Sequence, residues 1–307
     1  MTEGQIPKDF LRGPPPNATL RKLNFEKTNP PIPAFKGQFA AIVENLITEA
    51  ECKEFIRLAE ESTRTELPDS TLSPPKWVRA MVNVGDGREV MSTDHRKSQR
   101  IIFDSFDLAG RVMDRLMPFM RECEIDVIKN QPRVTGRDPA SQGEVLRLTR
   151  LNERLRVLRY EGGDYFRPHC DGCYVTPDGK ELSLFTIHLY LNGDGEQDME
   201  ELKPHIERAE KRNRLFKKFD LAPIDSEEVG VGSKEHPSAL ESADKSDTLL
   251  GGATSFTDGF ILKNSVRIFP KAGSVLIFQQ RNMLHGGDDV FRGVKYTVRT
   301  DVMYASV

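Results

Sequence analysis

Two short segments of the 307-residue sequence carry side chains that could together bind a metal ion. In the first, His169 and Asp171 stand two positions apart. Residues two apart in an extended chain point to the same side, so both side chains can reach one ion. The second segment holds His285, followed by two glycines. Two imidazole nitrogens and one carboxylate oxygen on one face of an ion leave three positions open, an arrangement typical of non-haem Fe(II) sites.

The elements that must position these residues are predicted from periodicity and capping patterns. A short strand is expected at 39–43, and a helix is expected to begin at Thr48 with the capping-box pattern Thr48-Glu49-Ala50-Glu51. A second helix is predicted from about Ser105 to Glu122. From 153 onward the apolar period changes to two, and strands are predicted at 155–160, 183–191, 274–278 and 295–304. This order favours a mainly β fold with flanking helices, either a β-sandwich or a jelly roll.

Two segments differ in composition from this predicted domain, which spans 36–307. Residues 1–35 are rich in proline, asparagine and charge, which predicts an extended N-terminal arm rather than a packed element. Residues 193–250 are highly charged and are expected to be an insertion between two core strands. Within it, a solvent-exposed helix is predicted over 199–219, followed by a Ser/Glu/Lys/Asp-rich stretch that we expect to be partly disordered.

The bulk composition narrows the possible partners and locations. There are 44 Lys and Arg residues against 47 Asp and Glu, a formal net charge of -3, so no broad basic field supports nucleic-acid binding. No apolar run approaches the ~20 residues of a membrane span, and the N-terminus lacks the pattern of a secretory signal. We therefore expect a cytoplasmic or nuclear protein without membrane association. The four cysteines form no disulfide framework.

An ordered series of motifs surrounds the possible metal ligands, and it resembles the prolyl 4-hydroxylase-like branch of the 2-oxoglutarate/Fe(II)-dependent oxygenases. The resemblance covers roughly 37–307 without the insertion, and it implies a double-stranded β-helix (jelly roll) core. The matching elements, in chain order, are Tyr160-x-x-Gly163-x-x-Phe166-x-x-His169-x-Asp171, Thr186-x-x-x-Tyr190-Leu191-Asn192, Gly251-Gly252-Ala253-Thr254-x-Phe256, Pro270-Lys271-Ala272-Gly273, and His285 followed ten residues later by Lys295.

The resemblance also implies cofactors and a reaction. His169, Asp171 and His285 match the residues that hold Fe(II) in the family, with 2-oxoglutarate and O₂ as cosubstrates and ascorbate as the expected reductant. Oxidative decarboxylation of 2-oxoglutarate yields succinate and CO₂ and supports hydroxylation of an unactivated C–H bond. The presence of Asp171 favours hydroxylation over halogenation, because the family's halogenases lack the carboxylate at this position.

The predicted strand at 295–304 suggests where the cosubstrate is held. Alternation places Lys295, Thr297, Arg299 and Asp301 on one face, and a dicarboxylate would account for a basic face inside a compact fold. In the family, the residue at the position of Lys295 binds the distal carboxylate of 2-oxoglutarate; Arg299 is the rival anchor, and we favour Lys295. Tyr190 matches a tyrosine that hydrogen-bonds this carboxylate, and Tyr160 matches another residue lining the cosubstrate. His188 departs from the usual apolar residue and is expected to line the pocket, not to be a fourth ligand.

Other functions stay open on the sequence alone. Cys170-x-x-Cys173 could indicate zinc or redox chemistry, although Cys52 and Cys123 are too isolated to complete a zinc site. A zinc hydrolase could use His169, Asp171 and His285. A catalytically inactive jelly-roll binding module is the non-enzymatic alternative. The substrate is either a prolyl residue of a peptide or protein, or a free amino acid or other small molecule.

Overall fold

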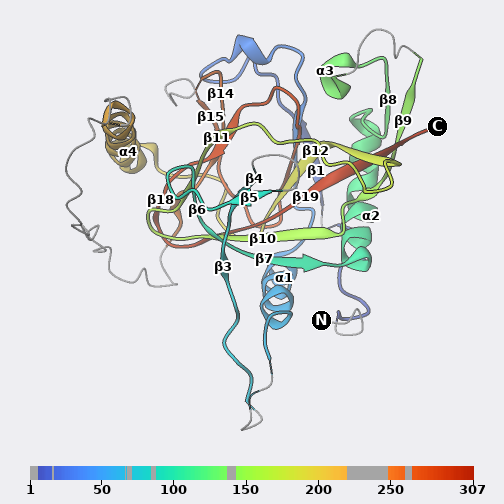
Figure 1. Ribbon diagram of the computed structural model, residues 1–307, viewed down its shortest axis with the longest axis horizontal. Helices are drawn as coiled ribbons and strands as arrows, with labels where there is room; N and C mark the ends of the chain where they lie inside the picture. The colour runs from blue at the N-terminus through green and yellow to red at the C-terminus, as the bar shows by residue number, and fades with distance from the viewer. Residues whose placement is uncertain are drawn as a thin grey trace.

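Two β-sheets form the body of the chain in the computed structural model (Figure 1), which describes residues 6–15, 17–65, 67, 71–83, 88–136, 143–219, 248–259 and 265–307. The larger sheet has the order β1 (Thr19–Lys22), β2 (Ala40–Glu44), β16 (Val275–Gln279), β12 (Glu181–Tyr190), β19 (Lys295–Ser306), β10 (Arg154–Tyr160), β7 (Gln99–Asp104) and β3 (Val78–Arg79). Two further strands extend it beside β19, namely β9 (Val145–Leu151) and β8 (Val127–Lys129). The smaller sheet has the order β15 (Ser265–Ile268), β14 (Thr254–Thr257), β17 (His285–Gly287), β11 (Tyr165–His169) and β6 (Arg96–Lys97).

The strand order identifies the core as a jelly roll. Its eight strands are β10, β11, β12, β14, β15, β16, β17 and β19. Numbered one to eight along the chain, they run 1-8-3-6 in the larger sheet and 2-7-4-5 in the smaller one. The chain thus crosses repeatedly between the two sheets, as in the two Greek keys of a jelly roll. The predicted mainly β fold with a jelly-roll core is confirmed.

Helices cover the outer face of the larger sheet. These are α1 (Glu49–Glu61) and α2 (Phe106–Glu122), and the short α3 (Pro132–Thr135) lies further along the chain. The capping box predicted at Thr48 is present, and Ser105 caps α2 through its hydroxyl. Phe55 of α1 and Leu116 of α2 are fully buried in one cluster with the outward-facing side chains of the sheet, such as Ile187. No helix within the described ranges has the length and apolar character needed to cross a bilayer.

The N-terminal segment packs against this body, so the prediction of an arm outside the packed core is wrong for 6–35. Phe10 and Leu11 are buried in the same cluster as α1 and α2, and β1 pairs with β2 along its full length. The Arg111 guanidinium donates hydrogen bonds to the carbonyl oxygens of Pro7 and Phe10, both at 2.7 Å. The proline-rich composition did not reveal this packing. A few apolar side chains, such as Phe10 and Leu11, are enough to anchor a segment without regular structure.

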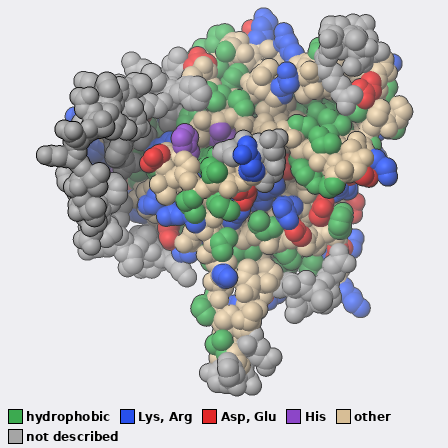
Figure 2. All heavy atoms as spheres, in the orientation of Figure 1, with side chains coloured by type: hydrophobic (Ala, Val, Ile, Leu, Met, Phe, Trp, Pro, Cys, Tyr) green, Lys and Arg blue, Asp and Glu red, His purple; other side chains and the backbone are tan. Residues whose placement is uncertain are grey.

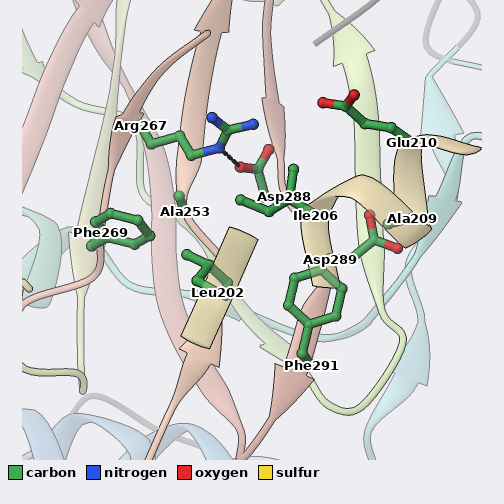
Figure 3. Close-up of a pocket in the computed structure, with 11 residues that line it drawn as sticks. Leu202, Ile206, Ala209, Glu210, Ala253, Arg267, Phe269, Asp288, Asp289 and Phe291 are labelled. Atoms are coloured by element: carbon green, nitrogen blue, oxygen red, sulfur yellow. Dashed lines mark hydrogen bonds and ion pairs between the residues drawn. The ribbon is translucent and has the colours of Figure 1, made fainter. Parts of the chain in front are cut away.

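The charged insertion begins with the helix α4 (Met199–Phe219), which has the predicted bounds. The helix is not solvated on all sides, however. Leu202 is 1% exposed and lies with Ile206 and Ala209 over Phe269 and Phe291 (Figure 3). Before the helix, the Gln197 side chain exchanges hydrogen bonds of 2.6 and 2.9 Å with the backbone of β13 (Leu250–Gly251), which pairs with β18 (Val290–Arg292). The expectation of disorder falls on residues that lie outside the described ranges.

The packing of α4 predicts a stability effect. Leu202→Ala is expected to lower the free energy of unfolding by about 2–5 kcal/mol, because it removes a buried leucine and leaves a cavity. Chemical denaturation of the full chain measures this change. Lys203→Ala, at an exposed position of the same helix, is the control and should stay within about 0.5 kcal/mol of the parent. Equal stability of the two variants would mean that α4 does not dock on the sheet in solution.

Candidate metal centre

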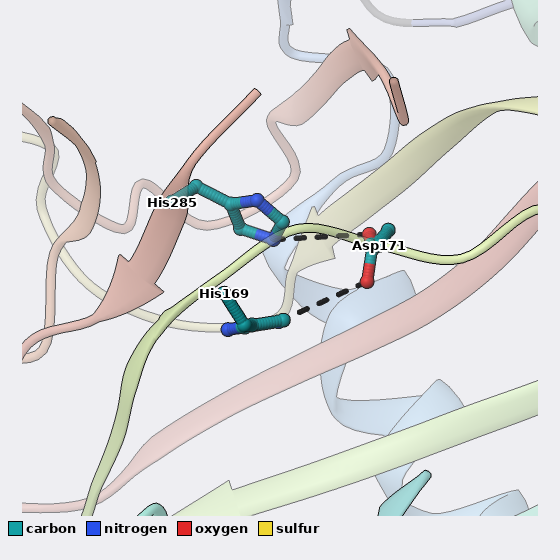
Figure 4. Close-up of side chains that lie close together, drawn as sticks. All are labelled: His169, Asp171 and His285. Atoms are coloured by element: carbon teal, nitrogen blue, oxygen red, sulfur yellow. Dashed lines mark ion pairs between the residues drawn. The ribbon is translucent and has the colours of Figure 1, made fainter. Parts of the chain in front are cut away.

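His169, Asp171 and His285 converge at one point between the two sheets, as predicted (Figure 4). His169 ends β11 and lies directly opposite His285, the first residue of β17. Asp171 follows two residues later, and its two carboxylate oxygens lie 3.8 Å from His169 Nε2 and 3.7 Å from His285 Nε2. Adjacent ligand atoms about 2.0–2.2 Å from one ion are separated by about 3 Å in a facial arrangement, so the side chains would move together by less than about 1 Å at these two contacts to share a metal.

Both imidazoles are held with the same nitrogen free. The Nδ1 atoms of His169 and His285 lie 2.9 Å from the carbonyl oxygens of Arg167 and Met283, each two residues earlier. A ring that donates Nδ1–H to a carbonyl keeps the lone pair of Nε2 available for a metal. Burial lowers the pKa of His169 to about 3 and also lowers that of His285, so both rings are neutral at physiological pH. Neutral imidazole is the form that binds a divalent ion.

The Asp171 carboxylate is held from the larger sheet. Its Oδ2 accepts a 2.7 Å hydrogen bond from the Thr186 hydroxyl, and its Oδ1 lies 3.0 Å from Arg299 Nη2. The same guanidinium nitrogen lies 3.2 Å from Asp301 Oδ1. Burial alone would raise the pKa of Asp171, but the Arg299 charge, the two imidazoles and the Thr186 hydroxyl hold it well below its usual range. The group is therefore a carboxylate whose orientation is set by two partners.

The three side chains differ in exposure, and this difference indicates which side of the site is open to solvent. The side chains of His285 and Asp171 are 2% and 9% exposed, whereas that of His169 is 24% exposed. A molecule that reaches a bound metal from solvent would therefore approach past His169. Phe166 stacks on the His169 ring with centroids 3.6 Å apart and forms part of this approach.

Lys295 lies on the inner face of the larger sheet, with Tyr160 directly opposite it on β10. Its Nζ is 5.3 Å from the ring centre of Tyr160 and 5.7 Å from that of Tyr190, within cation–π range. Lys295 is 4% exposed, and within the described residues no carboxylate lies within ion-pair distance of it. Burial lowers the pKa of Lys295 to about 8, against a smaller opposing effect of the Asp288 charge. A buried ammonium in this setting is a site for an anion.

Gly252 makes room for the side chain of Lys295, and hydrogen-bonding groups lie on the same face. Gly252 adopts a φ of +70°, and a Cβ there would lie 3.2 Å from Cδ of the lysine, so a side chain would crowd its stem. The Tyr190 hydroxyl donates a 2.8 Å hydrogen bond to the Thr254 hydroxyl. The Thr297 hydroxyl is buried without a hydrogen-bond partner, which suits a further polar group on this face.

His188 lines the same face but does not join the metal ligands. Its ring centre is 6.2 Å from that of His285 and 5.3 Å from that of Phe278. In the described part of the chain, the group of close ligand atoms contains only His169, Asp171 and His285. This agrees with the prediction that His188 is not a fourth ligand. Burial lowers its pKa well below 6.5, so the imidazole is neutral.

The cysteines do not form a second centre in the described structure. Cys170 and Cys173 are exposed and form no disulfide among the described residues, while Cys52 and Cys123 are buried elsewhere. Neither exposed cysteine belongs to the group of close ligand atoms, so the zinc alternative based on the C-x-x-C pattern has no structural support.

Several charged residues near the centre were not predicted from the sequence. Arg156 on β10 lies 3.3 Å from Asp301, and Arg96 on β6 lies 4.4 Å over the Phe166 ring. Strand alternation had placed Asp301 on the correct face, but nothing in the sequence identified its partners. The two-residue strand β6 is too short to give a periodic pattern.

Comparison with known proteins gives structural neighbours only. No protein-family model and no curated protein matches the chain. Similar solved structures include the viral collagen prolyl hydroxylase of Paramecium bursaria Chlorella virus-1 in complex with 2OG (16% identity, 88% of this chain and 97% of that one, TM-score 0.42). They also include a Pseudomonas putida prolyl-4-hydroxylase (11% identity, 87% and 92%, TM-score 0.41) and the non-heme alpha ketoglutarate dependent epimerase SnoN from nogalamycin biosynthesis (13% identity, 89% and 80%, TM-score 0.39).

At these identities and TM-scores, the description of the site rests on the residues of this chain. The strand order, the His169-x-Asp171 pair and the opposing His285 are observed directly. The chain therefore has a jelly-roll fold, and its site motifs resemble those of the prolyl 4-hydroxylase-like branch of the 2-oxoglutarate/Fe(II)-dependent oxygenases.

Proposed function

We propose that this protein is an Fe(II)- and 2-oxoglutarate-dependent dioxygenase that hydroxylates an unactivated C–H bond and releases succinate and CO₂. The observation that carries this proposal is the pairing of two features on facing sheets. One is the neutral-imidazole and carboxylate group formed by His169, Asp171 and His285. The other is the buried cation of Lys295, which has no anionic partner among the described residues and lies between two tyrosine rings.

The donor set fits Fe(II). Two imidazole nitrogens and one carboxylate on one side of an ion leave adjacent positions open, which suits O₂ activation better than a closed structural site. When bound, the iron and 2-oxoglutarate supply the oxidative chemistry, and the chain binds and orients the reacting groups. Thr186 and Arg299 hold Asp171 in one orientation, and the two backbone carbonyls hold the imidazoles.

The inner face of the larger sheet fits 2-oxoglutarate. We assign the distal carboxylate to Lys295, with Tyr160 and Tyr190 as the walls of its pocket. The rival, Arg299, is already engaged by Asp171 and Asp301, which favours Lys295 as the anchor. Burial of this face excludes water, so the ion pair with the cosubstrate gains strength from the low dielectric.

The substrate proposed for this site is a prolyl residue of a peptide or protein, or a free amino acid or other small molecule. Its target C–H bond would approach past His169, which is the exposed member of the three. Ascorbate is proposed as the reductant that keeps the iron in its active Fe(II) state during turnover.

The direct test is succinate formation. Purified protein with Fe(II), ascorbate and 2-oxoglutarate should convert 2-oxoglutarate to succinate, and candidate substrates should stimulate the conversion and gain one oxygen atom by mass spectrometry. Omission of Fe(II) is the control and should abolish the reaction. An iron-loaded protein that forms no succinate under any of these conditions would support the inactive binding module instead.

Arg299→Ala tests whether Arg299 orients the metal-binding carboxylate of Asp171 or binds 2-oxoglutarate. We expect it to weaken Fe(II) affinity about 10- to 100-fold, because partners that orient a metal-binding carboxylate typically contribute this much. Fe(II) affinity measured anaerobically, and 2-oxoglutarate affinity measured at saturating Fe(II), distinguish the two roles. The control is Arg159→Ala, on neighbouring β10, because the Arg159 side chain pairs with Glu161. A loss of 2-oxoglutarate affinity larger than the loss of Fe(II) affinity would make Arg299 the anchor.

A further inference from the structure

Four arginines from four strands gather beside the candidate metal centre. Arg156 lies directly opposite Arg299 in the pairing of β10 with β19, and Arg100 lies on β7 opposite the neighbouring Leu158. Arg96 comes from β6 of the facing sheet, and its guanidinium stacks over Phe166. On the face seen in Figure 2, Lys and Arg side chains lie close to histidines.

These arginines are incompletely neutralised by the chain. Arg156 and Arg299 share Asp301, at 3.3 and 3.2 Å. Arg96 is 8% exposed, and its guanidinium donates hydrogen bonds to the Ser98 hydroxyl at 3.1 Å and to the Met81 carbonyl at 3.3 Å. Among the described residues, no carboxylate forms an ion pair with it.

The fourth arginine is paired with an acid that comes from the surface. Arg100 is buried, and its guanidinium binds both carboxylate oxygens of Glu89, at 2.5 and 2.8 Å. Its Nε is buried without an acceptor. Glu89 belongs to the hairpin of β4 (Val82–Asn83) and β5 (Glu89–Val90), whose strands pair only with each other within the described structure. The Glu89 side chain is 33% exposed, whereas that of Arg100 is 7% exposed. A partly exposed carboxylate therefore forms the ion pair with a buried guanidinium.

The charges of the other arginines also act on the Glu89 carboxylate. The pKa of its carboxyl is lowered, first by the hydrogen bond from Arg100 and then, against the effect of burial, by the charges of Arg100, Arg156 and Arg96. The position of this carboxylate is therefore one at which three guanidinium groups act together. The carboxylate of a ligand would be attracted to the same place by these charges. A planar guanidinium can also donate two hydrogen bonds to its two oxygens.

The formal charges of the loaded centre leave the arginines in excess. Fe(II) and the 2-oxoglutarate dianion cancel, and so do Lys295 and Asp171. The four arginines then carry two more formal charges than Asp301 and Glu89 offset. Arg299, Arg156 and Arg100 each contact a carboxylate, so Arg96 is the one of the four without a contacting carboxylate in the described structure. Buried charge without a partner is costly, so a further anion is favoured at this place.

We propose that the substrate of this site carries a carboxylate, which binds Arg100 and Arg96 in place of Glu89. This inference rests on the proposed oxygenase function and narrows its substrate class to acids. The carboxylate belongs either to a small acid, such as a free amino acid, or to an acidic residue near the target in a peptide. A neutral prolyl peptide would leave the arginine excess unmatched.

Fractionated cell extract tests this proposal with the full-length, iron-loaded protein. Small molecules and peptides are separated by size. The small-molecule pool is passed over an anion exchanger at about pH 11, where the amino group is uncharged and free amino acids are anions, and the peptide pool is passed over it at pH 7. We expect stimulation of succinate formation to be in the retained fractions and to be lost when their carboxylates are converted to methyl esters. Activity in the small-molecule pool would indicate a small acid, and activity in the peptide pool would indicate an acidic peptide.

Variants connect the result to the arginines. With the active retained fraction as the probe, Arg100→Gln should raise the concentration needed for half-maximal stimulation about 10- to 100-fold, the value of a charge-assisted hydrogen bond. Glu89→Gln should lower it, because the internal competitor is gone. Arg154→Gln, on β10 but paired with Asp104 at the surface, is the matched control.

Stimulation that resides in the unretained fraction, or that survives esterification, would overturn the proposal while leaving the oxygenase function intact. An unchanged half-maximal concentration in Arg100→Gln would overturn the assigned residue. Absence of Fe(II)-dependent succinate formation under every condition would instead contradict the proposed function itself.

Discussion

Lys295→Ala is expected to weaken 2-oxoglutarate binding roughly 30- to 4,000-fold while leaving Fe(II) affinity nearly unchanged. Removal of one member of a buried charge pair typically costs about 2–5 kcal/mol, which corresponds to this range of affinity. The lysine is buried and does not contact the three candidate metal ligands, so the metal should be unaffected. Titration of 2-oxoglutarate at saturating Fe(II), without O₂, measures the effect.

Two further variants make the Lys295 test specific. Lys271→Ala removes a lysine whose ion pair with Glu44 is partly exposed, and 2-oxoglutarate affinity should stay as in the parent. Lys295→Arg keeps the charge, but Gly252 and the two tyrosines leave little space for a planar guanidinium. We expect partial recovery at most. Parent-like cosubstrate affinity in Lys295→Ala would show that the lysine is structural.

Asp171→Ala is expected to reduce Fe(II) affinity on the order of 100- to 1,000-fold and to abolish succinate formation. Apparent binding free energies of about 10–16 kcal/mol for four-ligand structural metal sites correspond to roughly 3–4 kcal/mol per ligand. The fold should persist, because Arg299 keeps its contact with Asp301. Anaerobic calorimetry and circular dichroism measure metal affinity and folding separately.

A matched control for this variant is Asp178→Ala in the loop between β11 and β12, where the carboxylate is exposed and binds Thr176. It should retain both Fe(II) affinity and turnover. Undiminished Fe(II) binding by Asp171→Ala would mean that the three converging side chains are not the metal centre, and the proposed function would lose its main support.

Strand alternation in the sequence predicted the inner face of the jelly roll well. On β12 and β19, a period of two put Tyr190 and Lys295 on the side where they are found, and their cross-strand partners follow from antiparallel pairing. His169 and His285 could be matched because short motifs identify them. These features depend on local geometry, which the residues themselves determine.

What the sequence could not predict depends on contacts between elements. Arg299 was placed on the correct face, but its pairing with Asp171 requires the approach of a loop from the facing sheet. Glu89 and Arg100 stand eleven residues apart on separate short strands, so no periodic pattern links them. α4 has few apolar residues, and only its packing shows that Leu202 is buried.

The backbone carbonyls that receive Nδ1–H from His169 and His285 make the centre independent of its metal during folding. In a zinc finger, by contrast, the ligands are unstructured until the ion binds, and the apo-protein is unfolded. Here each ring is fixed by a residue of its own chain segment, and the sheet pairing brings the two rings together. We therefore expect the fold to persist when a metal leaves and returns. Under the proposed function, we expect activity to be lost when iron is removed and regained when it is restored, with the protein folded throughout.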